Sequence, residues 1–136
     1  MRSISNAYSH ALASLAGWAI LMTILGALSV IGKPRARTSS GMPQRDYSDP
    51  YYRRDRAFRN AIETTGPFVA ALLAAVLTGT APFWVNLFAS VFLVARIATA
   101  AVHIGTEIQP LRSAFWSVGT LCILVLALMG LWGALT

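Results

Sequence analysis

Charged and polar side chains recur at helical spacing within stretches of the chain that are otherwise apolar. Arg56, Asn60 and Glu63 stand at positions i, i+4 and i+7, which places them on one face of a helix. Arg59 lies beside them, four residues before Glu63, so these two side chains can form an ion pair. Guanidinium groups gathered in this way can also bind an anionic ligand.

A second group of polar residues follows further along the chain. Arg96 and His103 are seven residues apart, on one face of a later apolar stretch, and Arg112 and Ser113 open the next one. A charge at the centre of a bilayer costs roughly 2.5 to 3.5 kcal/mol, so such residues usually face partners or a water-filled cavity. Arg96 therefore needs an anionic partner or ligand, and Glu63 across the bundle is the candidate. The spacing predicts a polar site at one level of several helices.

A purely structural interpretation competes with this site. Arg56 and Arg59 can extend to the lipid headgroups while Glu63 neutralises one of them, which costs little near a helix end. For Arg56 taken alone this interpretation is preferred. Arg96 lies about two helical turns inside its apolar stretch, so headgroup contact does not explain it.

Composition indicates the elements that must position these residues. The 136 residues are 56% hydrophobic and 12% charged, with a mean hydropathy of +0.59, which leaves little polar surface for a water-soluble globule. A membrane-spanning helix needs about 20 apolar residues. The sequence therefore predicts an all-α membrane protein, a single domain over 1–136 with a four-helix transmembrane bundle and a kink at Pro67. The predicted spans cover about 8–32, 56–79, 83–106 and 111–135.

The first span has one alternative, a secretory signal peptide. Its uncharged run from Ala11 to Ile31 is longer than a typical signal-peptide core and lacks a clear small-residue cleavage site. A transmembrane helix is therefore preferred. Cys122, the single cysteine, lies in the fourth span, so we expect a packing role, no intramolecular disulfide and no metal site.

Charge asymmetry predicts the topology. Ten of the eleven Lys and Arg residues lie in the polar loop 33–55, near the joint between the third and fourth spans, or in the adjoining helical turns; only Arg2 is at the other end. The positive-inside rule makes the loop side cytoplasmic and places both termini outside. The net charge is +6, and the basic residues responsible for it are spread through a loop next to the membrane and are not interleaved with aromatic residues. Anionic lipid headgroups explain it better than nucleic acid.

Several motifs resemble one family. Residues 56–68 read RAFRNAIETTGPF, which is similar to the second-helix signature of the membrane-associated proteins in eicosanoid and glutathione metabolism, the MAPEG family. A second set of motifs resembles the third and fourth helices of the microsomal prostaglandin E synthase and microsomal glutathione transferase branch of this family. This set consists of residues 92–96 (FLVAR), residues 105–110, Arg112 and Ser113. The resemblance covers about 56–135, and the preceding part fits by position and polarity, apart from the Ser48-Asp49-Pro50 segment.

This resemblance implies a homotrimer of four-helix subunits with glutathione bound between adjacent subunits, near the cytoplasmic end. A tripeptide with two carboxylates and one ammonium group needs several cations and one anion, and the polar residues supply both. Carried over, the roles are carboxylate binding by Arg59 and Arg96, binding of the polar backbone or amine by Asn60 and Glu63, support by Arg56, and activation of the thiol by Arg112 and Ser113.

Three positions depart from the family pattern. Trp116 and His103 stand where tyrosines are expected, and Thr99 stands in place of a histidine. His103 can either hydrogen-bond glutathione or fill the subunit interface. Trp116 is better suited to packing against lipid or a hydrophobic substrate than to catalysis.

The resemblance implies a glutathione-dependent transferase or peroxidase acting on lipophilic electrophiles or lipid hydroperoxides. Isomerisation of the prostaglandin synthase type is a further family activity. A non-catalytic trimeric membrane module that retains the fold is the alternative. A transporter is disfavoured, because four short helices leave little room for alternating access. The expected location is a bacterial inner membrane.

Overall fold

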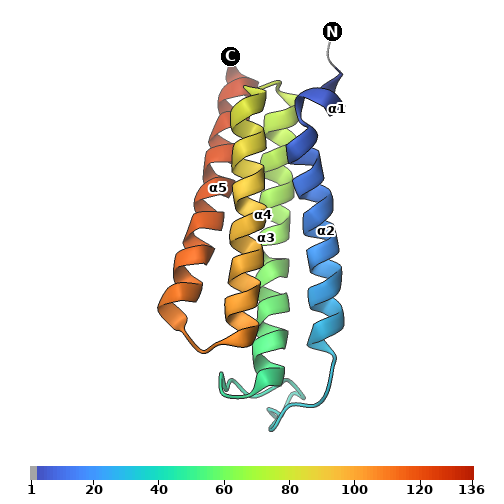
Figure 1. The fold of residues 1–136 in the computed structure, drawn as a ribbon, viewed down its shortest axis with the longest axis vertical. Helices are drawn as coiled ribbons and strands as arrows, with labels where there is room; N and C mark the ends of the chain where they lie inside the picture. Colours follow the sequence, from blue (N-terminus) through green and yellow to red (C-terminus); the bar gives the residue numbers. More distant parts are fainter. Residues whose placement is uncertain (1–2) are drawn as a thin grey trace.

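The computed structural model describes residues 3–136, and Arg2 lies outside this part. Its elements are the short α1 (Ile4–Ala7) and the long α2 (Ser9–Ser29), α3 (Pro50–Leu77), α4 (Pro82–Gly105) and α5 (Gln109–Leu135). The four long helices run side by side, with the chain ends at one end of the bundle and the long loop at the other (Figure 1). Each is long and apolar enough to cross a membrane. The predicted all-α transmembrane four-helix bundle is confirmed.

Helix α3 begins earlier than the predicted start at 56. The Asp49 side chain caps it, because Oδ1 accepts a hydrogen bond of 2.9 Å from the Tyr51 N–H, and Pro50 occupies the first turn, where no N–H is needed. The first turns of α3 are polar, so a hydropathy argument assigns them to the loop. The helix continues through Pro67 to Leu77.

Two arginines of this early segment tie the helices together. Arg54 donates hydrogen bonds to the carbonyls of Leu28 (3.1 Å) and Ile31 (2.7 Å) at the end of α2. Arg53 donates to the Ile104 carbonyl (3.0 Å) at the end of α4. Cations stabilise the free carbonyls and the negative end of a helix dipole. These residues, expected to be ordinary positive-inside charges, therefore also fix how α3 meets its neighbours.

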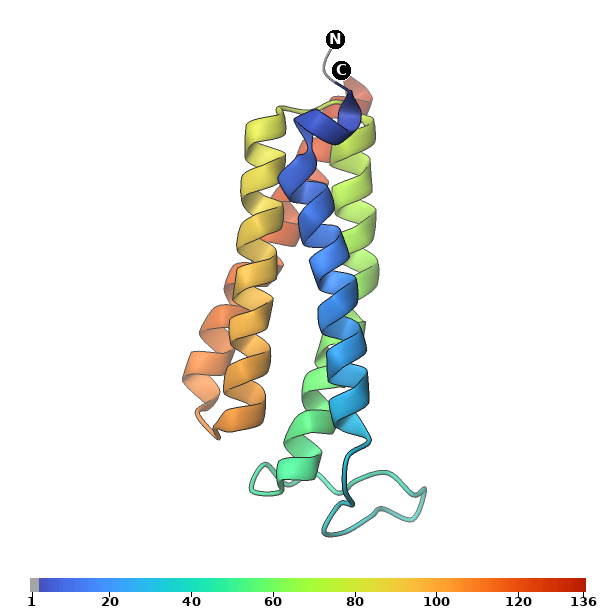
Figure 2. The ribbon, with the colours of Figure 1, turned by 45° about the vertical axis from the view of Figure 1, so that its right-hand side comes forward.

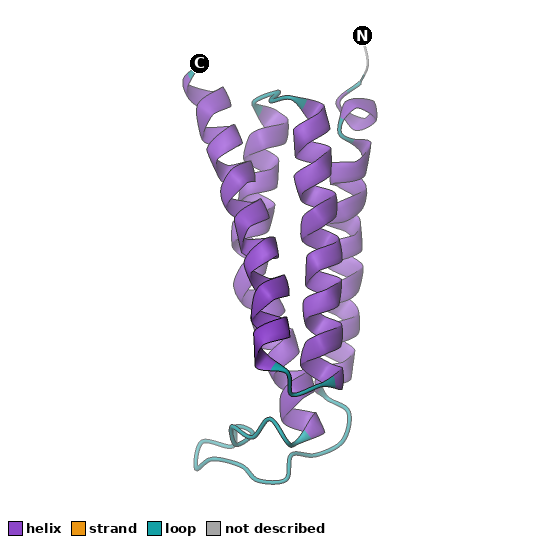
Figure 3. Cartoon of the chain, turned by 60° about the vertical axis from the view of Figure 1, so that its left-hand side comes forward, coloured by secondary structure: helices purple, strands orange, loops and turns teal. Residues whose placement is uncertain are grey.

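An aromatic cluster forms the centre of the bundle. Phe68 of α3 stacks on Phe92 of α4 with ring centroids 3.8 Å apart, and Trp18 of α2 meets both rings edge-on. The Trp18 indole N–H donates to Thr65 Oγ1 at 3.1 Å, which satisfies its polar atom. Helices α2 and α5 lie on opposite sides of the α3–α4 pair (Figure 2), and the connecting loops stay at the two ends (Figure 3).

Close packing of α5 against α3 depends on Gly130. A Cβ atom there would lie 2.7 Å from the Ala74 Cβ and 2.9 Å from the Ala75 backbone nitrogen. Small residues allow this approach in membrane helices, where van der Waals packing drives association. We expect Gly130→Ala to lower the free energy of unfolding by about 1 to 3 kcal/mol, measured by denaturant titration in detergent.

The matched control for this substitution is Gly105→Ala. A Cβ atom at Gly105 meets no atom of residues 3–136 within 4 Å. The control should leave the unfolding midpoint close to that of the unmodified protein. If Gly130→Ala and Gly105→Ala are equally stable, α3 and α5 can move apart to fit the extra methyl group without a loss of free energy of unfolding.

Candidate functional site

A cavity of about 280 Å³ lies near the loop end of the bundle, between α3, α4 and α5. Of the residues predicted for the site, Arg59 and Arg96 lie outside this cavity and all the others line it. Helical periodicity on α3, α4 and α5 thus brings together side chains that are far apart in the sequence. The lining residues are Tyr47, Arg56, Asn60, Glu63, Thr99, His103, Arg112, Ser113 and Trp116.

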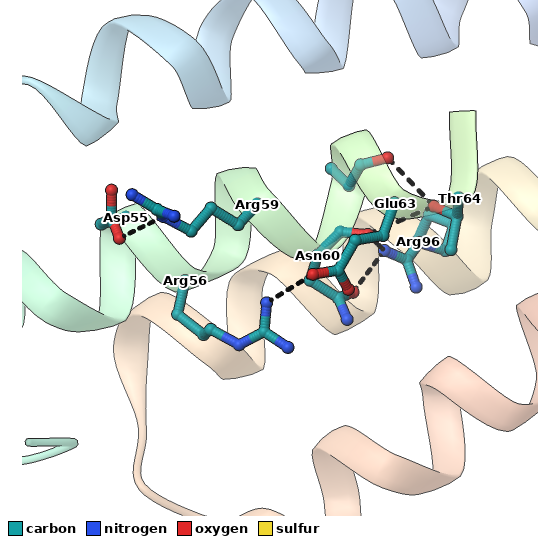
Figure 4. A network of polar contacts seen from close by, with 8 residues as sticks. Asp55, Arg56, Arg59, Asn60, Glu63, Thr64 and Arg96 are labelled. Atoms are coloured by element: carbon teal, nitrogen blue, oxygen red, sulfur yellow. Dashed lines mark hydrogen bonds and ion pairs between the residues drawn. The ribbon is translucent and has the colours of Figure 1, made fainter. Parts of the chain in front are cut away.

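An ion pair runs along the α3 wall of the cavity. Arg56 Nη1 lies 3.0 Å from Glu63 Oε1, so the guanidinium spans two helical turns (Figure 4). The i, i+4 spacing indicated that Arg59 can pair with Glu63, but Glu63 pairs with Arg56 and Arg59 pairs with Asp55. The Glu63 side chain is 58% exposed, so its carboxylate can accept a further donor from a ligand.

Arg59 points away from this cavity. Its Nε lies 2.8 Å from Asp55 Oδ2, one turn earlier on α3 (Figure 4), and its Nη2 lies 3.6 Å from the Met42 sulfur. The pair forms at i, i+4 with the acidic residue first, an order that is more favourable on a helix than the reverse order of Arg59 and Glu63. Arg59 lines a neighbouring hollow of about 400 Å³, which shares Arg56 and Glu63 with the first cavity. The Arg56–Glu63 pair therefore lies between the two spaces.

Arg96 is inside the bundle, with only 3% of its surface exposed. Its Nη2 donates to Asn60 Oδ1 at 2.6 Å, so Asn60 and not the predicted Glu63 is its partner (Figure 4). Its guanidinium also lies 5.8 Å from the Trp18 ring. Gly119 makes room for the stem, since a Cβ there would lie 3.0 Å from Arg96 Cδ. Packing between α4 and α5 therefore directs Arg96 to the inner side of Asn60.

The bond from Arg96 makes Asn60 important for stability. Within residues 3–136, Arg96 Nε and Nη1 have no hydrogen-bond partner. The remaining nitrogen, Nη2, is bonded to Asn60, which is therefore the one residue of this part of the chain that accepts hydrogen bonds from the guanidinium. Asn60→Leu should lower the free energy of unfolding by about 1 to 3 kcal/mol, because the buried guanidinium loses the 2.6 Å bond to the side-chain oxygen and keeps only the longer bond of 3.3 Å to the carbonyl of residue 60. Chemical denaturation in detergent measures this loss.

A double-mutant cycle with Arg96→Leu provides the control for Asn60→Leu. If the Asn60–Arg96 bond is responsible, Asn60→Leu should cost less in the Arg96→Leu background than in the unmodified chain, because both partners are then apolar. Equal costs in the two backgrounds would contradict the explanation.

On α4, His103 and Thr99 lie at the inner wall of the cavity. His103 is 3% exposed, and its Nδ1 has no hydrogen-bond partner in the part of the chain that the structure describes. The Thr99 hydroxyl donates to the Ala95 carbonyl at 2.8 Å and is thus used within α4. Of these two residues, His103 offers the polar atom that a ligand could engage.

The opposite wall is the start of α5, which begins at Gln109. Arg112 is half-buried and Ser113 is exposed, and both lie in the first turns of the helix. The positive end of the helix dipole is at this point. With Arg56 and Arg112 against the single carboxylate of Glu63, the charges of the cavity favour an anion.

One lining residue, Tyr47, comes from the loop and was not predicted from the sequence. The guanidinium carbon of Arg112 lies 4.6 Å from the centroid of the Tyr47 ring. The available signal was an aromatic residue directly before the Ser48-Asp49-Pro50 segment that starts α3. Loop residues have no periodicity, so this signal could not indicate which helix the ring would meet.

Comparison with known proteins decides the family. The MAPEG family model matches residues 10–132 of the chain. The chain belongs to the MAPEG family. This MAPEG protein is 34% identical to human prostaglandin E synthase over 102 residues, which cover 74% of the chain and 67% of the human protein. The resemblance found in the sequence is confirmed, and the match also includes α2, where the motifs offered little.

Family membership extends what the fold establishes. Four apolar helices and the MAPEG match together make the chain an integral multi-pass membrane protein. Membership also supports, in general terms, a glutathione-dependent membrane enzyme.

Proposed function

We propose that this MAPEG protein is a glutathione-dependent transferase or peroxidase that acts on lipophilic electrophiles or lipid hydroperoxides within the membrane. The cavity between α3, α4 and α5 carries the proposal, because it combines two guanidinium groups, one exposed carboxylate and a hydroxyl. Isomerisation, the further family activity that the resemblance implies, would use the same reacting sulfur, and the likeness to human prostaglandin E synthase is compatible with it.

The donor set fits glutathione chemically. The tripeptide carries two carboxylates and an ammonium group, so it needs cations and an anion in one site. We propose that Arg56 and Asn60 bind its carboxylate and backbone groups, while Glu63 accepts the ammonium group. His103 provides one further polar contact. Arg59 would reach the second carboxylate from the adjoining hollow, which shares two residues with the cavity.

For Arg96 we propose a different role from the carboxylate binding that the resemblance implied. Its guanidinium is buried and bonded to Asn60 from the side away from the cavity. It would therefore hold Asn60 in the orientation that ligand binding needs. In this proposal the free energy that it costs to bury the Arg96 cation is offset by its function, which is to orient Asn60.

Arg112 and Ser113 are proposed to act on the thiol. Glutathione supplies the sulfur that reacts with the substrate. Hydrogen bonds from a guanidinium and a hydroxyl at the start of α5 would stabilise negative charge on that sulfur and lower its pKa. Trp116, which is 39% exposed and lines the cavity, would form an apolar wall for the lipophilic substrate.

We further propose a homotrimer in which a neighbouring subunit completes each site, with the loop side in the cytoplasm. The cavity of about 280 Å³ is at the lower limit of the roughly 300 to 1,000 Å³ of typical ligand pockets, and in this proposal a neighbouring subunit supplies the remaining walls for the tripeptide and the substrate. The cationic residues at this end support the orientation. If crosslinking or native mass spectrometry finds monomers alone, the proposal of a site shared between subunits is contradicted.

The experiment that tests the function uses the purified full chain in detergent. Calorimetry measures glutathione binding, and turnover is followed with a chlorodinitrobenzene and with a lipid hydroperoxide. We expect binding and turnover of at least one of the two substrates. If the protein neither binds glutathione nor turns over either substrate, the proposal is overturned in favour of a non-catalytic trimeric membrane module.

A further inference from the structure

One wall of the cavity comes from the loop and not from a helix. The Tyr47 ring lies there, with the guanidinium carbon of Arg112 4.6 Å from its centroid. The same ring is tilted against His103 at 6.0 Å and meets Tyr52 edge-on at 5.1 Å. Tyr47 thus contacts residues of α3, α4 and α5 at once.

The backbone around Tyr47 is held in a tight turn. Asp46 Oδ1 accepts hydrogen bonds from the Ser48 N–H (2.9 Å) and the Ser48 hydroxyl (2.7 Å), which closes an Asx turn with Tyr47 at its centre. These hydrogen bonds, the hydroxyl first, hold the pKa of the Asp46 carboxyl below its ordinary value. The carboxylate form that closes the turn is therefore present at neutral pH.

Two further contacts anchor this turn to the bundle. Arg53 donates to the Tyr47 carbonyl at 2.8 Å and to the Ile104 carbonyl at 3.0 Å, so one side chain joins the turn to the end of α4. Asp49 is 4% exposed and accepts the Arg35 N–H at 2.9 Å as well as capping α3. The position of the ring is thus determined by bonds on both sides of it.

We propose that Tyr47 is a positioning residue for Arg112, an inference that rests on the proposed function. An aromatic face attracts a guanidinium and limits the rotamers of a long side chain. It also excludes water from one side of the cation, which strengthens the interaction of Arg112 with a negative sulfur. The ring, and not the hydroxyl, is the part that acts.

The test compares Tyr47→Ala with Tyr47→Phe. We expect Tyr47→Ala to lower kcat about tenfold at neutral pH and to shift the rate profile to higher pH, while KM for glutathione changes little. Tyr47→Phe keeps the ring and should retain the unmodified profile. Tyr51→Ala is the matched control, because the Tyr51 ring lies 5.9 Å from the guanidinium carbon of Arg54 and does not line the cavity.

A second measurement does not depend on glutathione. Phenylglyoxal modifies accessible arginines, and mass spectrometry gives the rate at Arg112. Tyr47→Ala should raise this rate several-fold, whereas Tyr47→Phe and Tyr51→Ala should not. Unchanged modification and an unchanged pH profile in Tyr47→Ala would overturn the inference, as would equal loss in Tyr47→Phe.

The two proposals fail in distinguishable ways. If the unmodified protein neither binds glutathione nor turns over, the proposed function fails, and the phenylglyoxal rate alone decides whether Tyr47 covers Arg112. If turnover is present and Tyr47→Ala behaves as the unmodified protein in both measurements, only the role of Tyr47 is lost. Thermal unfolding of each variant separates these outcomes from misfolding.

Discussion

Arg112→Ala should lower glutathione-dependent kcat by about 100-fold or more while the bundle stays folded and glutathione still binds. The expected size follows from the loss of one charged donor to a developing negative charge, which typically costs about 100- to 1,000-fold in rate. Arg112 is half-buried at the start of α5 and, within residues 3–136, forms neither a hydrogen bond nor an ion pair through its side chain. Its removal therefore leaves no buried group unsatisfied.

The measurement is a pH profile of turnover together with glutathione calorimetry. The proposed role predicts a bound thiol with a raised pKa in Arg112→Ala, so the remaining activity should increase as the pH rises. Arg112→Lys keeps the charge and loses the planar guanidinium, so its turnover should lie between that of the unmodified protein and that of Arg112→Ala. Full activity in Arg112→Ala would exclude this residue from thiol activation.

Ser113→Ala separates the two proposed activators. If the hydroxyl is the main donor, Ser113→Ala should show the larger loss and Arg112→Ala the smaller one. Ser117→Ala is the matched control one turn further along α5, since the Ser117 hydroxyl donates to the Ser113 carbonyl at 2.8 Å and does not line the cavity.

Glu63→Gln should weaken glutathione binding roughly 10- to 100-fold, the value expected for one hydrogen bond to a charged group. The substitution preserves shape and removes the single negative charge that lines the cavity, so the ammonium group loses its proposed counter-ion. It also releases Arg56 from the ion pair of 3.0 Å. Calorimetry measures the change directly.

Glu107→Gln is the control for Glu63→Gln. It also removes one negative charge near the loop end of the bundle, and the exposed Glu107 lines neither the cavity nor the adjoining hollow. Its effect on glutathione affinity should be clearly smaller than that of Glu63→Gln. Equal effects would indicate that general charge near the membrane surface, and not a contact with Glu63, determines affinity.

The helices could be predicted from sequence because their cause is local. A bilayer requires continuous apolar segments of sufficient length, and each of the four segments satisfies this requirement by itself. The polar start of α3 escaped prediction for the same reason, since Arg53 and Arg54 follow no apolar pattern. Their partners are carbonyls at the ends of α2 and α4.

Ion pairing within the site was harder to predict. Helical spacing favours a pair between Glu63 and Arg59 at i, i+4, whereas Arg56 is seven residues from Glu63 and reaches it only because its side chain extends along the helix. Neighbouring elements decide between them, because Arg59 meets Met42 from the loop while Arg56 faces the cavity. Arg96 is similar: its partner depends on the room that Gly119 leaves between α4 and α5.

By itself, then, the sequence determined the spans, the MAPEG family and the faces that carry Asn60 and Glu63, since periodicity and motifs are properties of a local stretch. Only the tertiary structure placed Arg96 behind Asn60 and Tyr47 against Arg112. Such contacts join segments distant in the chain, and their geometry depends on helix crossing, side-chain rotamers and a turn held by hydrogen bonds, none of which leaves a periodic trace in the sequence.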